Sequence, residues 1–152
     1  MDSKNRKIGL SLPQQMYVEA IDELVQKHGH AHSVEISRLL GVKKPSVTEV
    51  VSRLVALKIA KRSDQEVTLT KKGRAIAIEL AYRHETLRRF MVDVLEMDSD
   101  NANEMACRIE HSAGHEFVQR LLLLDEFIQS KEMASYKKQW CSFRRNVQAK
   151  RK

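Results

Sequence analysis

The chain has 152 residues, a length that suits one compact domain or a small domain followed by a helical part. Apolar residues make up 42% of it and charged residues 31%, which excludes global disorder, and no apolar run is long enough to cross a lipid bilayer. The net charge of +7 combines a balance of +7 over residues 1–89, −7 over residues 90–130 and +7 over residues 131–152.

This segregation of charge suggests two kinds of partner. A basic first part suggests a polyanion, and an acidic middle part suits cation binding. The alternative is chance segregation of solvated charges. The first residues contain no apolar segment typical of a secretion signal, so we expect a cytoplasmic protein whose two cysteines, Cys107 and Cys141, are thiols or ligands rather than a disulfide.

Two helices are predicted first in chain order. The first covers residues 13–28, begins with a proline and has Gly29 as its stop. The second is short and covers residues 34–40, with Ser33 as the expected N-cap and Gly41 at its end.

A third helix and a hairpin follow. The helix begins at Pro45, and apolar residues at i, i+3, i+4 and i+7 predict one buried stripe along it. The members of this stripe are Val47, Val50, Val51 and Leu54. Short β-prone pieces within residues 59–70 flank a polar tripeptide at 63–65, which predicts a small hairpin.

The second half of the chain is predicted to be helical. Thr70 and Asp98 are expected to cap two of its helices, and Gly114 to break the chain before a third. These helices cover residues 71–96, about 100–113, and 116–129. The basic tail interleaves aromatic residues with lysine and arginine, and we expect it to pack as a final helix on a dimer with Trp140 as anchor, or alternatively to reach for DNA.

The order helix, short helix, turn, helix and hairpin predicts a winged helix-turn-helix, whose third helix enters the major groove of DNA. Its exposed face and the hairpin carry side chains that can meet phosphates or base edges. These candidate DNA-binding residues are Lys43, Lys44, Pro45, Ser46, Thr48, Glu49, Ser52, Arg53, Lys61 and Arg62. Glu49 can accept from a cytosine amine but repels phosphate. The alternative is a helical bundle with a solvated polar face.

Cys107, Glu110 and His111 are spaced so that a helix places them on one face. A thiolate, a carboxylate and an imidazole suit Fe(II), Mn(II), Co(II) or Zn(II), and suit Mg(II) or Ca(II) poorly. Three ligands from one helix rarely complete a coordination shell, so others must come from elsewhere. Further candidate ligands are Met16, Glu19 and His84. The alternative is a buried cysteine beside a surface Glu-His pair.

The remaining motifs give weaker signals. The stretch HGHAH, with His28, His30 and His32, can bind metal adventitiously, but we expect a solvent-exposed turn. The sequence contains no complete zincin motif, glycine-rich phosphate loop or nucleophile elbow, so we expect no enzymatic activity.

Several longer segments resemble the diphtheria toxin repressor family, which includes iron-dependent and manganese transport regulators. They keep their order and spacing over about residues 13–125, and they read PQQMYVEAI, KKPSVTEVVSRL, LTKKGRAIA, YRHETL and NEMACRIEHSAGHEFVQRL. The resemblance implies a dimeric winged-helix repressor that binds operator DNA when loaded with a divalent metal, and that controls metal-uptake genes.

The resemblance also implies a ligand set. Met16, Cys107, Glu110 and His111 match the effector site of the iron-sensing branch. In the manganese branch carboxylates replace the methionine and the cysteine, whereas Glu19, His84, Glu110 and His111 match. The chain therefore mixes the two patterns, and its thioether and thiolate favour Fe(II) over Mn(II) in relative terms.

The chain departs from the family pattern at two places. The ancillary metal site of the iron branch requires residues that are here replaced by Arg88 and Asn103, so we predict that this site is absent or is rebuilt with Glu104. We also expect no SH3-like domain of the kind that longer relatives carry, so that the chain resembles the short members.

We therefore expect a mainly α protein. Residues 1–72 form a winged helix-turn-helix DNA-binding domain, and residues 73–152 form a helical metal-binding and dimerisation domain with a basic tail. The expected partners are double-stranded operator DNA and a second copy of the chain, and no membrane. The alternative is a winged-helix regulator that metal does not control.

Overall fold

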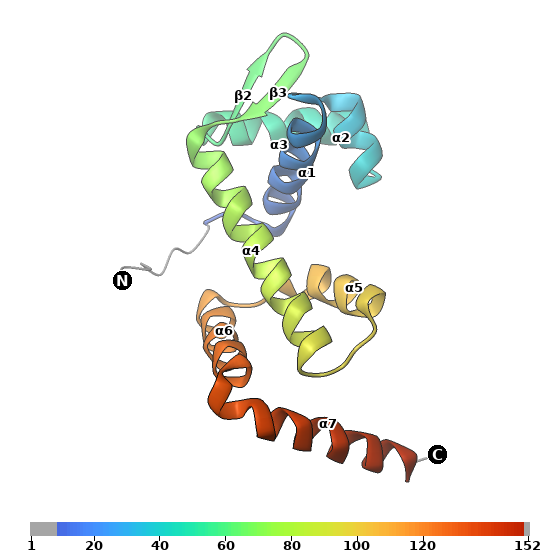
Figure 1. Ribbon diagram of the computed structural model, residues 1–152. Coiled ribbons are helices and arrows are strands. Elements are labelled where there is room, and N and C mark those ends of the chain that lie inside the picture. The colour runs from blue at the N-terminus through green and yellow to red at the C-terminus, as the bar shows by residue number, and fades with distance from the viewer. Residues whose placement is uncertain (1–8, 151–152) are drawn as a thin grey trace. The chain divides into compact units, whose positions relative to one another are not determined.

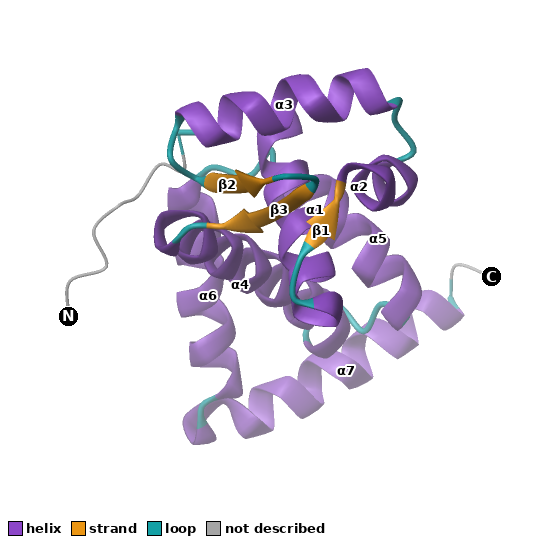
Figure 2. Cartoon of the chain, turned by 90° about the horizontal axis from the view of Figure 1, so that it is seen from above, coloured by secondary structure: helices purple, strands orange, loops and turns teal. Residues whose placement is uncertain are grey.

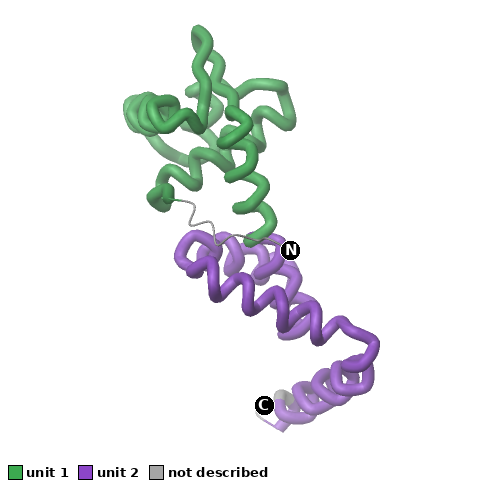
Figure 3. The backbone as a smooth tube through the Cα atoms, turned by 90° about the vertical axis from the view of Figure 1, so that its left-hand side faces the viewer, with its two compact units in different colours: residues 1–83 green, residues 84–152 purple. Residues whose placement is uncertain are grey.

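The computed structural model describes residues 9–150, except for the side chain of Gln148. Contacts divide the chain into two compact units, residues 1–83 and residues 84–152, which are green and purple in Figure 3 and are described separately below. Within residues 9–150, no helix combines the length and the apolar character needed to span a membrane.

The predicted boundary between residues 72 and 73 divides a DNA-binding domain from a metal-binding domain, whereas the two compact units are divided by their contacts. The predicted boundary therefore stays a prediction. The expectation about a secretion signal concerns residues 1–8, which lie outside the described residues.

The elements follow the order predicted from the sequence, with one additional strand (Figure 1). The first unit contains α1 (Leu12–His28), β1 (Ala31–His32), α2 (Ser33–Leu40), α3 (Lys44–Ala56), β2 (Ala60–Ser63), β3 (Glu66–Leu69) and the first part of α4 (Lys71–Asp93). The second unit contains the end of α4, α5 (Ser99–Glu110), α6 (His115–Gln129), the 3₁₀ turn η1 (Lys131–Met133) and α7 (Ala134–Ala149).

The sheet of the first unit has the strand order β1-β3-β2, and both of its pairs are antiparallel. The hairpin β2–β3 pairs Ala60 with Leu69 and Ser63 with Glu66, as the sequence predicts. Figure 2 shows these strands beside α1, α2 and α3. The unit is therefore a winged helix, with β2 and β3 as its wing.

The core of the first unit confirms the predicted stripe of α3. Val47, Val51 and Leu54 are fully buried, whereas Val50 is half-buried and packs against the edge of the core. The other side chains of this core come from α1, α2, the sheet and α4, and they include Val18, Ile21, Ile36, Val67 and Leu80. Burying one face of α3 leaves its polar face exposed.

The prediction for the start of α2 is wrong by one residue. His32, not Ser33, is the N-cap, because the pairing of β1 with β3 holds His32 in an extended conformation. The Glu35 carboxylate accepts a hydrogen bond of 2.9 Å from the His32 backbone N–H. The expectation of an exposed turn at HGHAH holds for the exposed His28 and Gly29, but it is wrong for residues 31–32, because Ala31 is fully buried in β1.

The predicted helix ends are also corrected in the second unit. α4 ends at Asp93 rather than residue 96, because Glu96 is left-handed and the Met97 N–H bonds back to the Met91 carbonyl at 2.9 Å. α5 ends at Glu110 rather than residue 113. Asp98 caps α5 as predicted, since its carboxylate accepts from two backbone N–H groups of the first turn.

α7 packs on the rest of the second unit through polar contacts. The Trp140 indole N–H donates to the Val94 carbonyl at 2.7 Å, and Arg144 pairs with Glu96. The expected final helix is thus confirmed, whereas its packing on a dimer with Trp140 as anchor and its alternative role on DNA stay predictions.

Gly73 lies where α4 starts against the end of α3 and the wing. Thr70 caps α4 as predicted, since its hydroxyl accepts from the Gly73 N–H at 3.1 Å. A Cβ atom at residue 73 would lie 2.1 Å from the Ile59 carbonyl oxygen. Only glycine therefore lets α4 approach the backbone this closely.

We predict that Gly73→Ala lowers the free energy of unfolding by about 2–3 kcal/mol, because the backbone of Ile59 has to move. Gly114→Ala is the matched control, because nothing lies within 4 Å of its added Cβ, and its cost should stay below about 1 kcal/mol. Urea unfolding measures both values. An equal loss in the two variants would contradict the close packing at Gly73.

Candidate metal centre and DNA-binding surface

The second unit gathers candidate metal ligands around one buried carboxylate, that of Glu110 at the end of α5. His84 reaches it from α4, with Nδ1 3.0 Å from Glu110 Oε2. The Cys107 thiol, one turn earlier on α5, also bonds to this carboxylate. His111 completes the set, with Nε2 3.5 Å from Glu110 Oε1. One ligand atom from each of His84, Cys107 and Glu110 fits within 4.8 Å of the others.

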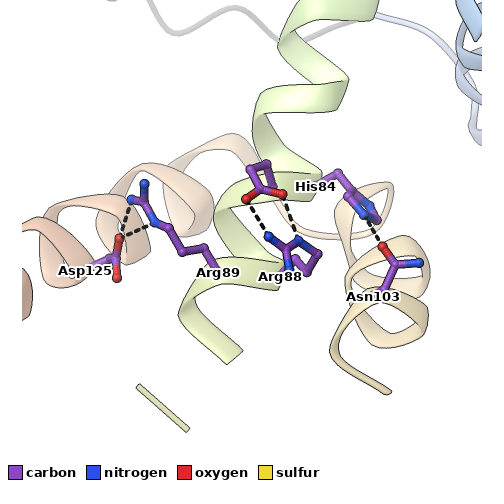
Figure 4. A network of polar contacts seen from close by, with 6 residues as sticks. His84, Arg88, Arg89, Asn103 and Asp125 are labelled. Carbon is purple, nitrogen blue, oxygen red and sulfur yellow. Dashed lines mark hydrogen bonds and ion pairs between the residues drawn. The ribbon is translucent and has the colours of Figure 1, made fainter. Parts of the chain in front are cut away.

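The orientation of the His84 ring is fixed from its other side (Figure 4). Its Nε2 lies 3.0 Å from Oδ1 of Asn103, which accepts the hydrogen bond. Nε2 therefore carries a proton, and Nδ1 is the atom that faces the Glu110 carboxylate. A second contact of this kind is the usual means by which proteins orient an imidazole toward a metal.

Burial governs the electrostatics of this site. Glu110 is only 2% exposed, and burial raises the pKa of its carboxyl, although His84 and the Cys107 thiol partly offset that effect. Burial also lowers the pKa of His111, as does the nearby His84. Both shifts disfavour the charged form. The sequence alternative of a buried cysteine beside a surface Glu-His pair is wrong, because Cys107 is exposed and Glu110 is buried.

The residues present fit a divalent transition metal. A thiolate, imidazoles and a carboxylate form a mixed donor set that suits Fe(II), Mn(II), Co(II) or Zn(II). A metal ion would supply the positive charge that the buried Glu110 carboxylate lacks.

The two candidate ligands from α1 belong to the first unit. Met16 is exposed and Glu19 is half-buried, and they lie one turn apart on α1. Their role as ligands stays a prediction.

The residues that replace the ancillary ligands take part in a polar network (Figure 4). The Arg88 guanidinium donates two hydrogen bonds of 2.8 Å to Glu85 and lowers the pKa of that carboxyl. Asn103 bonds to His84. The absence or rebuilding of a second site here stays a prediction, but the charge of Arg88 opposes a cation at this place.

One ion pair with a buried carboxylate was not predicted from the sequence. Arg89 of α4 pairs with Asp125 of α6, which is fully buried (Figure 4). Asp125 directly follows the apolar run LLLL of α6. An acidic residue next to this apolar run was the one signal in the sequence that could have indicated a buried carboxylate. The pair joins α4 to α6 within the second unit.

The candidate DNA-binding side chains are accessible. All of them are exposed on the polar face of α3, at its start or on β2, namely Lys43, Lys44, Pro45, Ser46, Thr48, Glu49, Ser52, Arg53, Lys61 and Arg62. Glu49 is paired with Arg53 at 2.5 Å, and both side chains are more than 60% exposed. An exposed pair of this kind is worth little, so Arg53 can exchange this partner for a phosphate. Their contact with DNA stays a prediction.

Fold and site together define a class of protein, a winged-helix DNA-binding protein with a helical metal-binding part. Comparison with protein-family models agrees with this class. The model described as the N-terminal DNA binding domain of iron dependent repressors matches residues 10–56, and the one described as their metal binding and dimerisation domain matches residues 70–134. The chain belongs to the iron-dependent repressor family.

Individual relatives differ in length. An uncharacterized HTH-type transcriptional regulator of Methanocaldococcus jannaschii is 29% identical over 117 residues, which are 76% of this chain and 94% of that protein. The iron-dependent repressor IdeR of Mycobacterium tuberculosis is 31% identical over 111 residues, 71% of this chain but 47% of the repressor. The crystal structure of T. acidophilum IdeR is 28% identical with a TM-score of 0.67, over 77% of this chain and 55% of that one. The chain thus spans about half the length of the two IdeR proteins.

We predict that metal affinity falls on acidification, since a proton on Glu110 competes with the metal and burial raises the pKa of that carboxyl. Glu110→Gln should bind metal more weakly and lose part of this pH dependence. Glu116→Gln, an exposed glutamate of α6, is the control and should behave like the parent. Anaerobic Mn(II) titrations at several pH values measure the effect, and a variant Glu110→Gln with the parent's affinity would contradict the site.

Proposed function

We propose that the protein is a metal-dependent transcriptional repressor that binds operator DNA as a homodimer when loaded with Fe(II) or Mn(II), and that it controls metal-uptake genes in the cytoplasm. One observation carries the proposal. His84, Cys107 and His111 converge on the buried carboxylate of Glu110, in a chain whose α3 exposes a polar face suited to DNA.

The ligand set supports iron or manganese. We propose that Met16 and Glu19 of α1 add to the ligands of the second unit, as the sequence pattern implies. The thiolate of Cys107 favours Fe(II) over Mn(II), although metal supply and geometry also decide, and Zn(II) or Co(II) are alternatives.

The residues of the centre respond to metal through charge. The bound ion supplies the positive charge that a buried carboxylate lacks. With the ion bound, Cys107 would act as a thiolate after losing its proton to solvent, and His84 would offer the lone pair of Nδ1, so that one cation would replace protons around Glu110. If the metal binds the DNA-competent state of the protein more tightly than the other state by about 1–3 kcal/mol, the affinity for DNA rises roughly 5- to 150-fold.

The homodimer is supported by exposed apolar surface on α6. Phe117, Leu123 and Phe127 are each more than half exposed. Large apolar side chains gathered on one helix are typical of a protein interface.

The alternative is a winged-helix regulator whose DNA binding does not respond to metal. The exposed polar face of α3 supports both candidate functions equally, because it would bind DNA in either case. Metal dependence of DNA binding separates the two.

We predict that DNA binding requires metal. A duplex selected from a random library with the Mn(II)-loaded chain should bind roughly 5- to 150-fold more weakly after chelation, as filter binding measures. Cys107→Ala and His111→Ala should reduce this dependence. Cys141→Ala, which removes the other cysteine from α7, is the control and should retain it. Equal binding with metal and with chelator would favour the alternative.

We predict that Lys44→Ala weakens binding to all duplexes alike, since Lys44 is exposed at the start of α3 and suits a phosphate. The slope of the logarithm of affinity against the logarithm of salt concentration should fall by about one. Lys27→Ala on α1, whose ammonium pairs with Glu23 at 2.6 Å, is the control with an unchanged slope. The same slope in parent and Lys44→Ala would remove Lys44 from the interface.

A further inference from the structure

A second group of metal-binding side chains lies in the first unit, at the base of the wing. His30 and His32 flank the buried Ala31 of β1, and both are half-buried. Their rings lie 4.7 Å apart between centroids. Glu66 of β3 is paired directly with His32 in the sheet.

The three side chains converge. His30 Nδ1 lies 3.8 Å from Oε1 of Glu66. One ligand atom from each of His30, His32 and Glu66 fits within 4.8 Å of the others. Small rotations of the side chains would bring such atoms to the separations found around one metal ion.

The His32 ring is held in the tautomer that a ligand needs. Its Nδ1 lies 3.2 Å from the backbone carbonyl of Gln65. A carbonyl only accepts, so Nδ1 carries the proton and Nε2 of the neutral ring keeps its lone pair. A contact from the non-ligating nitrogen to a backbone carbonyl is a recurring support for metal-bound histidine.

The backbone under the cluster is fixed as well. Residues 31–32 pair with β3, and the His32 N–H donates to the Glu35 carboxylate at 2.9 Å. The cluster therefore rests on two strands and a helix N-terminus rather than on a loose histidine-rich loop, and Glu35 adds a second negative charge beside it.

We propose that His30, His32 and Glu66 form a second metal site, separate from the centre at Glu110, that binds a divalent transition metal such as Zn(II). Two imidazoles and one carboxylate, without sulfur, form a donor set that Zn(II) accepts with water in the remaining position. Mn(II) binds nitrogen ligands more weakly in the order of divalent metals. An ion at this place joins the strand after α1 to the wing.

The test is a competition titration of Zn(II) on the full chain with a chromophoric chelator. His30→Gln and Glu66→Gln should each lower Zn(II) affinity at one site by at least about tenfold. The control is His28→Gln, which removes an exposed histidine of the same HGHAH stretch outside the cluster and should titrate like the parent. Hydrogen exchange adds a structural readout, in which Zn(II) slows the amides of β3 in the parent but not in Glu66→Gln.

Two outcomes would overturn the proposal. In one, the parent, His30→Gln and Glu66→Gln bind the same number of Zn(II) ions with the same affinity. In the other, His28→Gln loses as much affinity as the cluster variants, which would show general binding by histidines. Co(II) distinguishes this site from the Glu110 centre. Co(II) at the Glu110 centre would be bound by the thiolate of Cys107 and would show a thiolate-to-cobalt absorption band, whereas the cluster of His30, His32 and Glu66 contains no sulfur and would show none.

Discussion

The contact between His84 and the buried Glu110 carboxylate is the interaction on which the second unit depends. It joins α4 to α5 where a carboxylate has lost nearly all contact with water. An isolated buried charge is very costly, so the groups around Glu110 must supply either a proton or a cation. The same burial that raises the pKa of this carboxyl also makes it a strong partner for a metal. Burial of Glu110 therefore lowers the stability of the metal-free protein and raises its affinity for metal.

The end of α4 organises the second unit through further polar contacts. Arg89 pairs with the buried Asp125 of α6, and the Val94 carbonyl just after α4 accepts from Trp140 of α7. A buried carboxylate without a partner is strongly unfavourable, so Asp125 favours the arrangement of α4 and α6 in which Arg89 reaches it. Neighbouring helices thus meet α4 at defined residues, and this holds His84 in position facing α5. In the first unit, Gly73 and Thr70 play the corresponding part by fixing the start of α4 against Ile59.

Local patterns predicted much of the fold but not the features that depend on distant residues. The stripe of α3, the caps at Thr70 and Asp98 and the hairpin follow from spacing and turn chemistry within a few residues. β1 was not predicted because two residues become a strand only through β3, more than 30 positions later. The spacing of Cys107, Glu110 and His111 indicated a shared face, but it could not show which member is buried. Burial depends on packing against residues far away in the sequence, which the local spacing does not contain, and the ligand roles themselves stay predictions.

The position of Trp140 has a practical consequence. It is the chain's one tryptophan, and its indole N–H bonds to the backbone just after α4 while part of the ring stays open to solvent. Indole emission depends on polarity and on hydrogen bonding at this nitrogen. The intrinsic fluorescence of the protein therefore reports on a single joint, the seating of α7 beside α4, without any attached dye.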